Sequence, residues 1–505
     1  MKKIDYYLNR VTMYRLLIYS LSFFLLVAIG LSFFKLFPYK PLDIIMSAGF
    51  IMALCFIVNG VFAYAFEAPS NDESVVITAL ILALIITPQY SSDYVVLAVW
   101  ASVLAMASKY ILAIGKKHIF NPAAIAVVLT AIFLNQSASW WIANLYTAPI
   151  IFIGGFLIVR KIKRADLLYA FFGTALLTAL IFGIGKGTNP ILVLSMTIIY
   201  SSLMFFAFTM LTEPMTTPPT RNGRIAYGAL AGFLFVPAVH FGSLYFTPEL
   251  ALITANIFSY LISPKHKLIL EFKEKVLVAN NSYDFIFTPS KKINFKPGQY
   301  MECTLKHEDS DSRGVRRFFT VASSPTEDTV HFGIKFYDKP SSFKQTLLSL
   351  KSGDTMVAAQ LAGDFYMPAD KNKKLVFIAG GIGVTPFRSM IKSLLDTGEA
   401  RDIVFFYANT EEADIAYKDI FDAANSNLGI KTIYSLSKTE AIRADWPGIK
   451  GLITKELILA EVPDYKERMF YISGPHAMVA AYSGILQELG VTRDQIKVDY
   501  FPGFA

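Results

Sequence analysis

The pattern of hydrophobic and polar positions changes once, about halfway along the chain. Up to about residue 263, long apolar runs are separated by short polar loops, whereas the remaining residues are charged and alternate between apolar and polar. Because a membrane span needs roughly 20 apolar residues, the first half predicts a polytopic α-helical membrane domain of about ten helices. The runs that predict these helices cover residues 14–34, 43–66, 75–88, 93–114, 121–134, 147–160, 166–184, 190–211, 225–241 and 248–263.

Two of these runs, at 75–88 and 121–134, are shorter than a full span. They are bounded by Pro and Asn, and they predict half-helices that surrounding protein must cover. Loops rich in Lys and Arg usually mark the cytoplasmic side, and with an even number of spans they predict both termini in the cytoplasm. We therefore expect a multi-pass protein of a bacterial inner membrane, with the charged half of the chain in the cytoplasm.

The second half begins near Ser263-Pro264, where the composition changes. From about 268 to 368, short segments alternate between apolar and polar positions, which predicts an antiparallel β-barrel. From about 373 the order is strand, glycine loop, helix, strand and helix, which predicts a parallel α/β unit. The expected domains are residues 1–263 in the membrane, 264–370 as a barrel and 371–505 as a nucleotide-binding unit.

Composition narrows the chemistry that this chain can carry. The formal net charge of +8 lies largely in loops of an apolar protein, so it does not indicate nucleic acid. Only two cysteines exist, Cys55 and Cys303, so we expect neither a cysteine-ligated iron–sulfur cluster nor a disulfide framework. A transmembrane haem needs paired histidines on spanning helices, whereas the first half contains only His118 and His240. We therefore expect no haem.

The membrane half shows signs of an internal repeat. Thr78-Ala-Leu and Phe120-Asn-Pro-Ala in its first part are echoed by Thr174-Ala-Leu and Thr212-Glu-Pro-Met in its second part. Repeats with interrupted helices commonly place a ligand at their interface. Chance similarity among apolar segments is the alternative explanation.

Hydroxyl-bearing residues and one carboxylate gather at the end of a predicted span, in Thr212-Glu-Pro-Met-Thr-Thr-Pro-Pro-Thr220. Such groups are costly there unless they hold something. A capped helix end followed by a Pro-rich turn would explain the same residues without a ligand.

Three segments, at 77–88, 115–124 and 212–220, resemble the NqrB/RnfD family. These are the flavin-bearing membrane subunits of the sodium-pumping NADH:quinone reductase and of the Rnf complex. The resemblance covers about residues 40–263, and it implies that the membrane domain holds FMN.

In that family a Thr shortly after an Asp-Pro carries FMN through a phosphoester bond. By its spacing, Thr220 matches this acceptor, with Glu213 in place of the Asp and Thr217 among the neighbouring hydroxyls. Two prolines precede Thr220 where the family usually has small residues, and prolines fix the backbone. Covalent and non-covalent FMN therefore both stay open.

A glycine loop follows the first apolar strand of the last domain, at Gly380-Gly-Ile-Gly-Val-Thr-Pro386. Gly380, Gly381 and Gly383 let the backbone approach a ligand closely, and the N-terminus of the next helix favours a pyrophosphate. Taken alone, such a loop is weak evidence, because many strand-to-helix turns merely pack closely.

The glycine loop is one of a series of motifs in a fixed order. Together they resemble the ferredoxin–NADP reductase superfamily over residues 267–505, which implies FAD as cofactor and NADH or NADPH as substrate. The motifs are Pro297-Gly-Gln-Tyr300, Arg317-Phe-Phe-Thr320, Ser323-Ser-Pro325, Gly363-Asp-Phe365, the glycine loop, Ser473-Gly-Pro475 and a terminal aromatic segment.

The resemblance assigns roles on the flavin side. Arg317 would pair with the FAD pyrophosphate, Phe319 would lie against the isoalloxazine, and Thr320 would form a hydrogen bond near flavin N5, where hydride arrives. An ordinary core position is the alternative for Phe319. Further phosphate contacts are expected from the amides around the start of the next helix, at Ser341, Ser342 and Phe343.

On the nucleotide side, Thr385 and the three glycines would hold the dinucleotide, with Gly474 and Pro475 beside it. Ser473 stands where the family usually has Cys, next to the reacting nicotinamide carbon. Phe501 is the candidate for stacking near the flavin, with ordinary core packing as the alternative.

Residues near the second and third strands of the last domain influence the choice of nucleotide. Ser435, Ser437 and Lys438 could bind the 2′-phosphate of NADPH, whereas Glu411 and Glu412 would repel it. The balance favours NADH.

These features predict a one-chain electron conduit. NAD(P)H would reduce FAD, and single electrons would pass to a flavin in the membrane half and on to a quinone or an outward-facing flavoprotein. A redox-driven transporter of an ion or small molecule is the alternative, although no spanning run has a carboxylate at its centre. A haem reductase of the NADPH-oxidase or ferric-reductase type is disfavoured by the histidine count.

Overall fold

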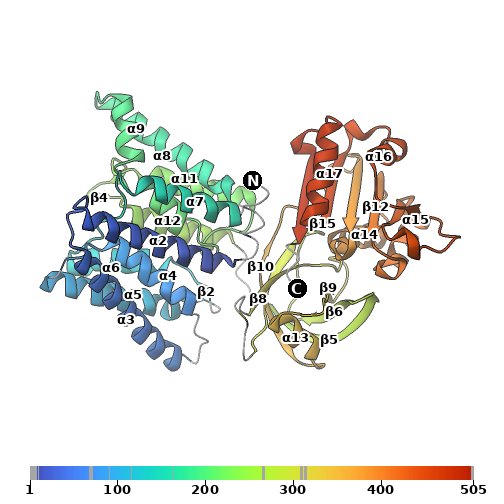
Figure 1. Ribbon diagram of the computed structural model, residues 1–505, viewed down its shortest axis with the longest axis horizontal. Helices are drawn as coiled ribbons and strands as arrows, with labels where there is room; N and C mark the ends of the chain where they lie inside the picture. Colours follow the sequence, from blue (N-terminus) through green and yellow to red (C-terminus); the bar gives the residue numbers. More distant parts are fainter. Residues whose placement is uncertain are drawn as a thin grey trace. The chain divides into compact units, whose positions relative to one another are not determined.

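The computed structural model describes residues 8, 11–66, 72–89, 91–114, 117–162, 164–263, 268–307, 311 and 315–501. The chain forms two compact units, Met1–Lys265 and His266–Ala505, which we call the helical unit and the two-sheet unit (Figure 1). The junction predicted from the change in composition falls partly on residues 264–267, which lie outside the described residues. The division of the second unit at residue 370 stays a prediction.

In the helical unit, the predicted apolar runs coincide with helices, and the run 190–211 is a bent series of short ones. The helices are α2 (Met13–Phe33), α3 (Pro41–Ala65), α4 (Asp72–Ile85), α5 (Ser92–Ile111), α6 (Pro122–Leu134), α7 (Ala148–Ile162), α8 (Ala165–Gly185), α9 (Pro190–Ile198), α10 (Leu203–Phe205), the π-helix η1 (Phe206–Met210), α11 (Arg221–Phe235) and α12 (Pro248–Ile262). Two short antiparallel pairs join them, β1 (Ala113–Ile114) with β2 (Lys117–His118) and β3 (His240–Phe241) with β4 (Leu244–Tyr245).

Only some of these helices are long enough to cross a membrane. Among the described residues, α2, α3, α5 and α8 meet the requirements of length and composition. The pair formed by α9 and by α10 with η1 is bent by 53° and would make a fifth span if counted as one. The described residues thus contain four or five candidate spans. The predicted count of about ten membrane helices is not confirmed, because several of the helices are shorter than a full span.

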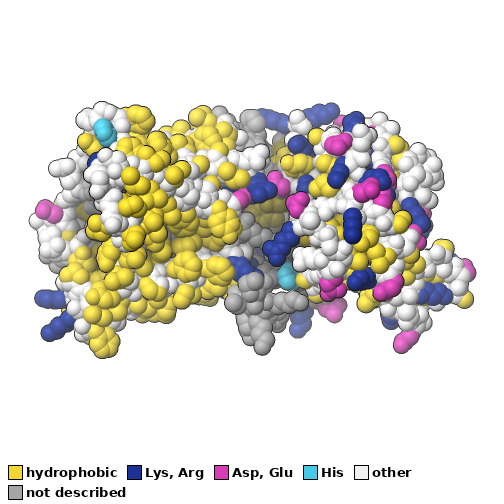
Figure 2. Space-filling model, turned by 90° about the horizontal axis from the view of Figure 1, so that it is seen from above, with side chains coloured by type: hydrophobic (Ala, Val, Ile, Leu, Met, Phe, Trp, Pro, Cys, Tyr) yellow, Lys and Arg dark blue, Asp and Glu magenta, His cyan; other side chains and the backbone are white. Residues whose placement is uncertain are grey.

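Large hydrophobic side chains lie on the surface of the helical unit. Phe23, Leu26 and Ile57 are each at least half exposed, and Figure 2 shows hydrophobic side chains over the visible face of this unit, with few charged ones among them. A surface of this kind is suited to contact with lipid.

The first sheet of the two-sheet unit is antiparallel, as the alternating pattern predicts. Its strands stand in the order β8-β7-β10-β5-β6-β9, and its core is filled by phenylalanines that include Phe285, Phe287 and Phe332. Closure of this sheet into a barrel stays a prediction. The strands are β5 (Leu268–Ala279), β6 (Ser282–Pro289), β7 (Tyr300–Thr304), β8 (Arg316–Thr320), β9 (Val330–Lys335) and β10 (Thr355–Ala362), and helix α13 (Ser342–Ser349) follows β9.

The second sheet is parallel, in the order β14-β13-β12-β11-β15-β16. Chain order runs in opposite directions on the two sides of β11, and ligands of such sheets bind beyond the carboxyl ends of the strands at this switch point. The strands are β11 (Leu375–Gly380), β12 (Ile403–Asn409), β13 (Lys431–Leu436), β14 (Ile449–Lys450), β15 (Met469–Pro475) and β16 (Ile496–Phe501). The helices are α14 (Thr385–Thr397), α15 (Lys418–Leu428), α16 (Lys455–Glu461) and α17 (His476–Glu488).

Both cysteines are buried, Cys55 in α3 and Cys303 in β7, and neither forms a disulfide. Burial raises the pKa of the Cys303 thiol above its ordinary value. The thiol therefore stays protonated and unreactive near neutral pH.

Candidate functional site

The glycine loop lies at the switch point of the parallel sheet. Strand β11 is buried along its whole length, and a short 3₁₀ turn at Gly381–Val384 leads into α14. Gly381 has φ +52°, and a Cβ on Gly383 would lie 2.5 Å from Cα of Gly474. The loop after β11 therefore packs against the backbone of β15 at Gly474, next to the N-terminus of α14. This arrangement is suited to a pyrophosphate.

Two buried polar side chains flank this loop on the neighbouring strands. Ser473 pairs in register with Ala379, and its Oγ is buried without a hydrogen bond to another described residue. On the other side, Asn409 follows Ala408, the partner of Gly380. The Asn409 amide is buried beside the Tyr407 hydroxyl, yet neither amide atom makes a well-formed hydrogen bond.

Buried polar groups without partners are rare, and leaving one so costs about 1–3 kcal/mol. The Ser473 hydroxyl therefore fits a ligand that supplies a hydrogen-bonding group, and the Asn409 amide, with the Tyr407 hydroxyl beside it, lies on the neighbouring strand. Ser473 was predicted as a site residue, whereas Asn409 was missed. Its position at the carboxyl end of the second strand was the only signal in the sequence.

The remaining predicted nucleotide residues lie around the same loop. Thr385 is buried at the start of α14, and its hydroxyl donates to the carbonyl of Ile382 at 3.3 Å. Gly474 and Pro475 pair in register with Tyr500 and Phe501 of β16. The side chain of Phe501 lies outside the described residues, so its predicted stacking stays a prediction.

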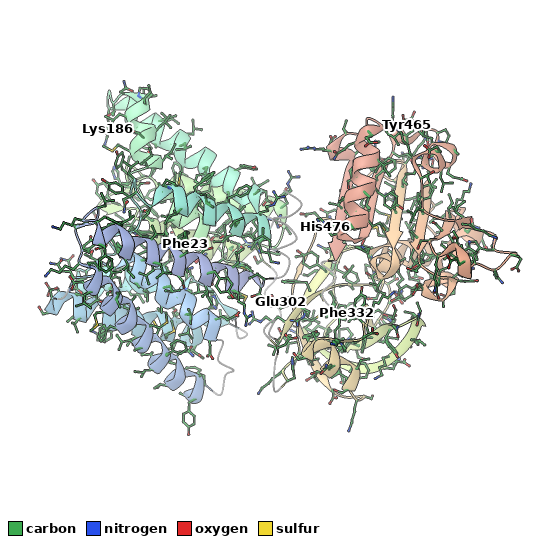
Figure 3. All side chains as sticks on the ribbon, viewed as in Figure 1. Phe23, Lys186, Glu302, Phe332, Tyr465 and His476 are labelled. Carbon is green, nitrogen blue, oxygen red and sulfur yellow. The ribbon has the colours of Figure 1, made fainter. Side chains whose placement is uncertain are left out.

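The predicted flavin residues lie on β8, an edge strand paired with β7. Arg317 and Phe319 share one face of the strand, because side chains alternate along it. The centre of the Phe319 ring lies 5.8 Å from the ring centres of both Phe343 and Phe332, and the Arg317 guanidinium lies 5.2 Å from the centre of the Phe343 ring. Figure 3 labels Phe332. Thr320 ends the strand and is buried. Arg317 thus lies beside the start of α13, and its contact with a pyrophosphate stays a prediction.

The start of α13 is occupied by a carboxylate. The Ser342 N–H donates to Asp311 Oδ2 at 3.2 Å, and Arg317 Nη2 lies 3.6 Å from Asp311 Oδ1. Ser341 accepts the N–H of Lys344 as the helix cap. The Ser342 hydroxyl is bound to His307 and to the N–H of Asp311, each at 2.9 Å. One anionic group is therefore held between Arg317 and the helix N-terminus, which is the charge environment a phosphate needs.

In the helical unit, Glu213 belongs to a chain of hydrogen bonds that the sequence did not predict. Its two carboxylate oxygens bind His118 Nε2 at 3.1 Å and Asn121 Nδ2 at 2.9 Å. The backbone N–H of Asn121 donates to Asn256 Oδ1, and the Asn256 amide donates to Tyr227, each at 2.9 Å. The echoed Asn-Pro and Glu-Pro segments contact each other through these hydrogen bonds. The internal repeat was therefore the one feature of the sequence that could have indicated this contact.

Of the other residues predicted to hold FMN, only Thr217 contacts Glu213. The Thr217 hydroxyl donates to the Glu213 backbone carbonyl at 3.1 Å and is buried. Thr220 instead caps α11 and accepts the N–H of Gly223 at 3.3 Å, with its side chain exposed. An exposed hydroxyl fits the acceptor of a phosphoester bond, because a modifying enzyme can reach it.

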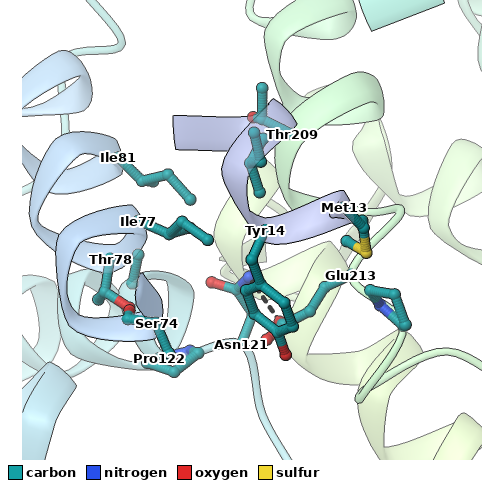
Figure 4. A pocket seen from close by; sticks show the side chains of 13 residues that line it. Met13, Tyr14, Ser74, Ile77, Thr78, Ile81, Asn121, Pro122, Thr209 and Glu213 are labelled. Atoms are coloured by element: carbon teal, nitrogen blue, oxygen red, sulfur yellow. Dashed lines mark hydrogen bonds between the residues drawn. The ribbon is translucent and has the colours of Figure 1, made fainter. Parts of the chain in front are cut away.

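A small pocket of about 30 Å³ lies beside Glu213 (Figure 4). It is lined from α2, α4, the start of α6 and η1, and its polar lining includes Ser74, Thr78, Asn121 and Thr209. This volume holds a water molecule or a small ion but not a flavin ring.

Two family matches divide along the same lines as the fold. Residues 144–267 match the NQR2, RnfD, RnfE family, and residues 377–484 match the oxidoreductase NAD-binding domain. The first match lies in the helical unit up to its junction, and the second covers the glycine loop and Ser473.

Curated relatives match about two fifths of this chain. A glycine betaine monooxygenase reductase subunit of Pseudomonas aeruginosa is 28% identical over 39% of this chain and 53% of its own. A flavohemoprotein of Bacillus subtilis is 27% identical over 41% of this chain and 51% of its own. The chain thus spans about half the length of the curated relatives it matches.

Solved structures also match slightly less than half of this chain. The cytochrome b5 reductase domain of Ulva prolifera nitrate reductase is 22% identical, with a TM-score of 0.42, over 47% of this chain and 98% of its own. The FAD/NAD-binding domain of nitric oxide dioxygenase from Vibrio cholerae is 19% identical, with a TM-score of 0.41, over 46% and 98%. From the two family matches, the chain joins a domain of the NQR2, RnfD, RnfE family, at residues 144–267, to an oxidoreductase NAD-binding domain, at residues 377–484.

Proposed function

We propose that the protein is a membrane-bound NAD(P)H dehydrogenase. NAD(P)H reduces FAD in the two-sheet unit, and electrons pass to FMN in the helical unit and on to a quinone or an extracytoplasmic flavoprotein. The observation that carries the proposal is the pairing of the glycine loop with the buried hydroxyl of Ser473, in a chain whose other unit has four or five candidate spans among its described residues. The unit that oxidises NAD(P)H lies in the cytoplasm of a bacterium, with the helices in its inner membrane.

Three residues of β8 would hold FAD. Arg317 presents a planar fork to the pyrophosphate, Phe319 presents a ring to the isoalloxazine, and Thr320 presents a hydroxyl near flavin N5. FAD supplies the change from a two-electron donor to one-electron steps, which no cysteine-ligated cluster in this chain could supply. Binding requires that the Asp311 carboxylate give up its place to the pyrophosphate.

NADH is the proposed donor, because acidic residues neutralise the cations near the second strand. Lys438 Nζ lies 2.5 Å from Glu411 Oε1, and Arg443 Nε lies 3.2 Å from Glu412 Oε2. The Ser435 hydroxyl is buried and donates to the carbonyl of Gly451. Of the three groups that could bind a 2′-phosphate, Ser435 and Lys438 are thus already engaged, and Ser437 is exposed.

The choice of nucleotide is tested with Glu411→Gln, which frees Lys438. We expect the ratio of kcat/KM for NADPH to that for NADH to rise about tenfold, because one charge repulsion becomes an attraction. Lys418→Ala removes an exposed pair on α15 and serves as control. An unchanged ratio would contradict this assignment.

The flavin content of the purified chain tests the electron path. We expect one FAD and one FMN per chain, and we expect Thr220→Ala to keep reduction of FAD by NADH while it blocks reduction of the membrane acceptor. Thr220→Ser keeps both the hydroxyl and the helix cap and should restore transfer. If FMN stays with the peptide containing Thr220 after denaturation, the linkage is covalent. Normal quinone reduction by the Thr220→Ala protein would remove Thr220 from the path.

A second candidate function, redox-driven ion transport, is favoured by the pocket beside Glu213. The pocket lies where the two echoed segments meet and is lined by hydroxyl and carboxylate oxygens. Uptake of isotope-labelled cations into vesicles during NADH oxidation tests it. Uptake that is lost in Glu213→Gln while NADH oxidation persists would support transport, and no uptake by the unmodified protein would exclude it.

A further inference from the structure

One buried ion pair joins the nucleotide loop to the flavin strand within the two-sheet unit. Arg388 lies in the first turn of α14, three residues after Thr385 of the glycine loop. Glu327 lies between β8 and β9, seven residues after Thr320. The contact between Arg388 and Glu327 therefore connects the two segments that would carry the nicotinamide and the flavin.

The geometry of this pair fixes both distance and orientation. Arg388 Nη2 donates to Glu327 Oε1 at 3.0 Å, and Nη1 donates to Glu327 Oε2 and, at 3.0 Å, to the carbonyl of Ala322. The side chain of Arg388 is 7% exposed and that of Glu327 is 18% exposed. A two-pronged contact of a planar guanidinium is the most directional of ion pairs. Arg388 thus binds the segment after Thr320 at two points, the Ala322 carbonyl and the Glu327 carboxylate.

Neighbouring contacts pack closely around the ion pair and restrict the movement of Arg388. The Ser389 hydroxyl donates to the carbonyl of Ser323 at 2.6 Å and is fully buried. A Cβ on Gly333 of β9 would lie 2.6 Å from Cγ2 of Thr385 and 2.6 Å from the Tyr417 hydroxyl. The loop that begins α14 therefore touches the antiparallel sheet directly, and a shift of Arg388 would be passed on to Thr385.

Burial and charge keep the pair ionised. Burial by itself raises the pKa of Glu327, but the hydrogen bonds and charge of Arg388 outweigh it, and the pKa lies below its ordinary value. A buried carboxylate held in this way cannot be replaced by a solvent contact without a large cost.

We propose that Arg388 and Glu327 form a clamp that sets the distance between the nicotinamide and the flavin, so that Arg388 is a positioning residue for hydride transfer. This inference rests on the proposed function. In the step concerned, the C4–H bond of the reduced nicotinamide breaks, and its electron pair and proton pass together to the flavin. The donor becomes NAD⁺, and the flavin takes up one further proton from solvent.

The clamp is tested on the full chain, purified in detergent with FAD bound. Arg388→Lys keeps the charge but loses the fork, and Glu327→Gln keeps the shape but loses the charge. We expect the rate constant for FAD reduction, measured by rapid mixing with NADH, to fall about 10- to 100-fold in each, because misplacement by about 1 Å has this effect. Lys418→Ala, which loses an exposed pair on α15, should keep the rate of the unmodified protein.

Two readouts separate positioning from a general loss of structure. FAD content and the Kd for NADH should stay within about threefold of the unmodified protein, because uniform binding is not affected. The deuterium isotope effect with NADH labelled at the transferred position should be fully expressed. A lower rate explained entirely by lost FAD, or an unchanged rate, would overturn the clamp.

A milder variant covers the case in which the ion-pair variants do not fold. Ser389→Ala removes only the hydrogen bond to Ser323 and should slow FAD reduction about threefold with its isotope effect kept. If Ser389→Ala reduces FAD at the normal rate and neither ion-pair variant folds, the clamp is also overturned. If NADH fails to reduce FAD in the unmodified protein, the proposed function fails, whatever the variants do.

Discussion

Adding a single methyl group to the glycine loop tests whether its backbone packs as described. In Gly383→Ala the new Cβ would lie 2.5 Å from Gly474 Cα, 2.7 Å from its nitrogen and 2.7 Å from the Ser473 carbonyl oxygen. All three atoms belong to backbone, so no side chain can rotate away. Ordinary contact begins at 3.4 Å, and the two loops must therefore separate by about 0.9 Å.

Such a separation has two expected effects. Overpacking of this kind costs about 1–3 kcal/mol of folding free energy, and a displacement near 1 Å at a reacting centre costs about 100-fold in rate. We expect Gly383→Ala to keep its FAD, because Arg317 lies in the other sheet, and to lose about 100-fold in the rate of FAD reduction by NADH. The assay is rapid-mixing reduction of bound FAD, together with thermal unfolding.

Two other glycines separate the possible causes. Gly381 has φ +52° and open space around its Cβ position, so Gly381→Ala introduces backbone strain of about 1–2 kcal/mol without a clash. Gly484 lies within α17 with nothing within 4 Å, so Gly484→Ala should stabilise the protein by about 0.5–1 kcal/mol. Turnover of Gly383→Ala within about twofold of the unmodified protein, well short of the loss expected from misplacement, would refute the close packing of the two loops.

Two further predictions concern charge. Arg317→Ala should weaken FAD binding about 10- to 100-fold, because a charged hydrogen bond contributes about 1.5–3 kcal/mol. Arg316→Ala, on the opposite face of β8, should leave FAD binding unchanged. The flavin retained after dialysis measures both effects. Hydrogen bonds from Arg468, with Lys374 adding to them, lower the pKa of Asp464 to about 2 from 3.8. The folded state thus gains stability from Asp464 above pH 4 and loses it as the pH falls toward 2; Asp464→Asn should flatten this dependence in denaturant titrations, and an unchanged slope would contradict it.

The sequence was most informative where structure depends on local pattern. The apolar runs predicted the positions of the helices, because the length and hydrophobicity of a run can be determined from the sequence alone. The bend of 53° between α9 and the helices after it was missed. The run 190–211 has no charged residue, and the Ser201-Ser202 pair between α9 and α10 was not interpreted as a break. The π-helix at Phe206–Met210 leaves no mark in hydrophobic periodicity.

Contacts between distant residues could not be predicted in the same way. Arg388 and Glu327 are 61 residues apart, and Glu213 and His118 are 95 apart. Both pairings depend on how sheets and helices come together, which one sequence does not record. The glycine loop and Ser473 could be proposed as site residues from the sequence because motif order gave a long-range constraint, whereas no motif pointed to Asn409.

The burial of both cysteines has a consequence for oxidative damage. A reduced flavin that meets oxygen produces peroxide, which attacks exposed thiolates first. Cys55 and Cys303 are both buried, and the raised pKa of Cys303 keeps its thiol protonated. Peroxide formed by an electron leak from this protein should therefore spare both of its thiols.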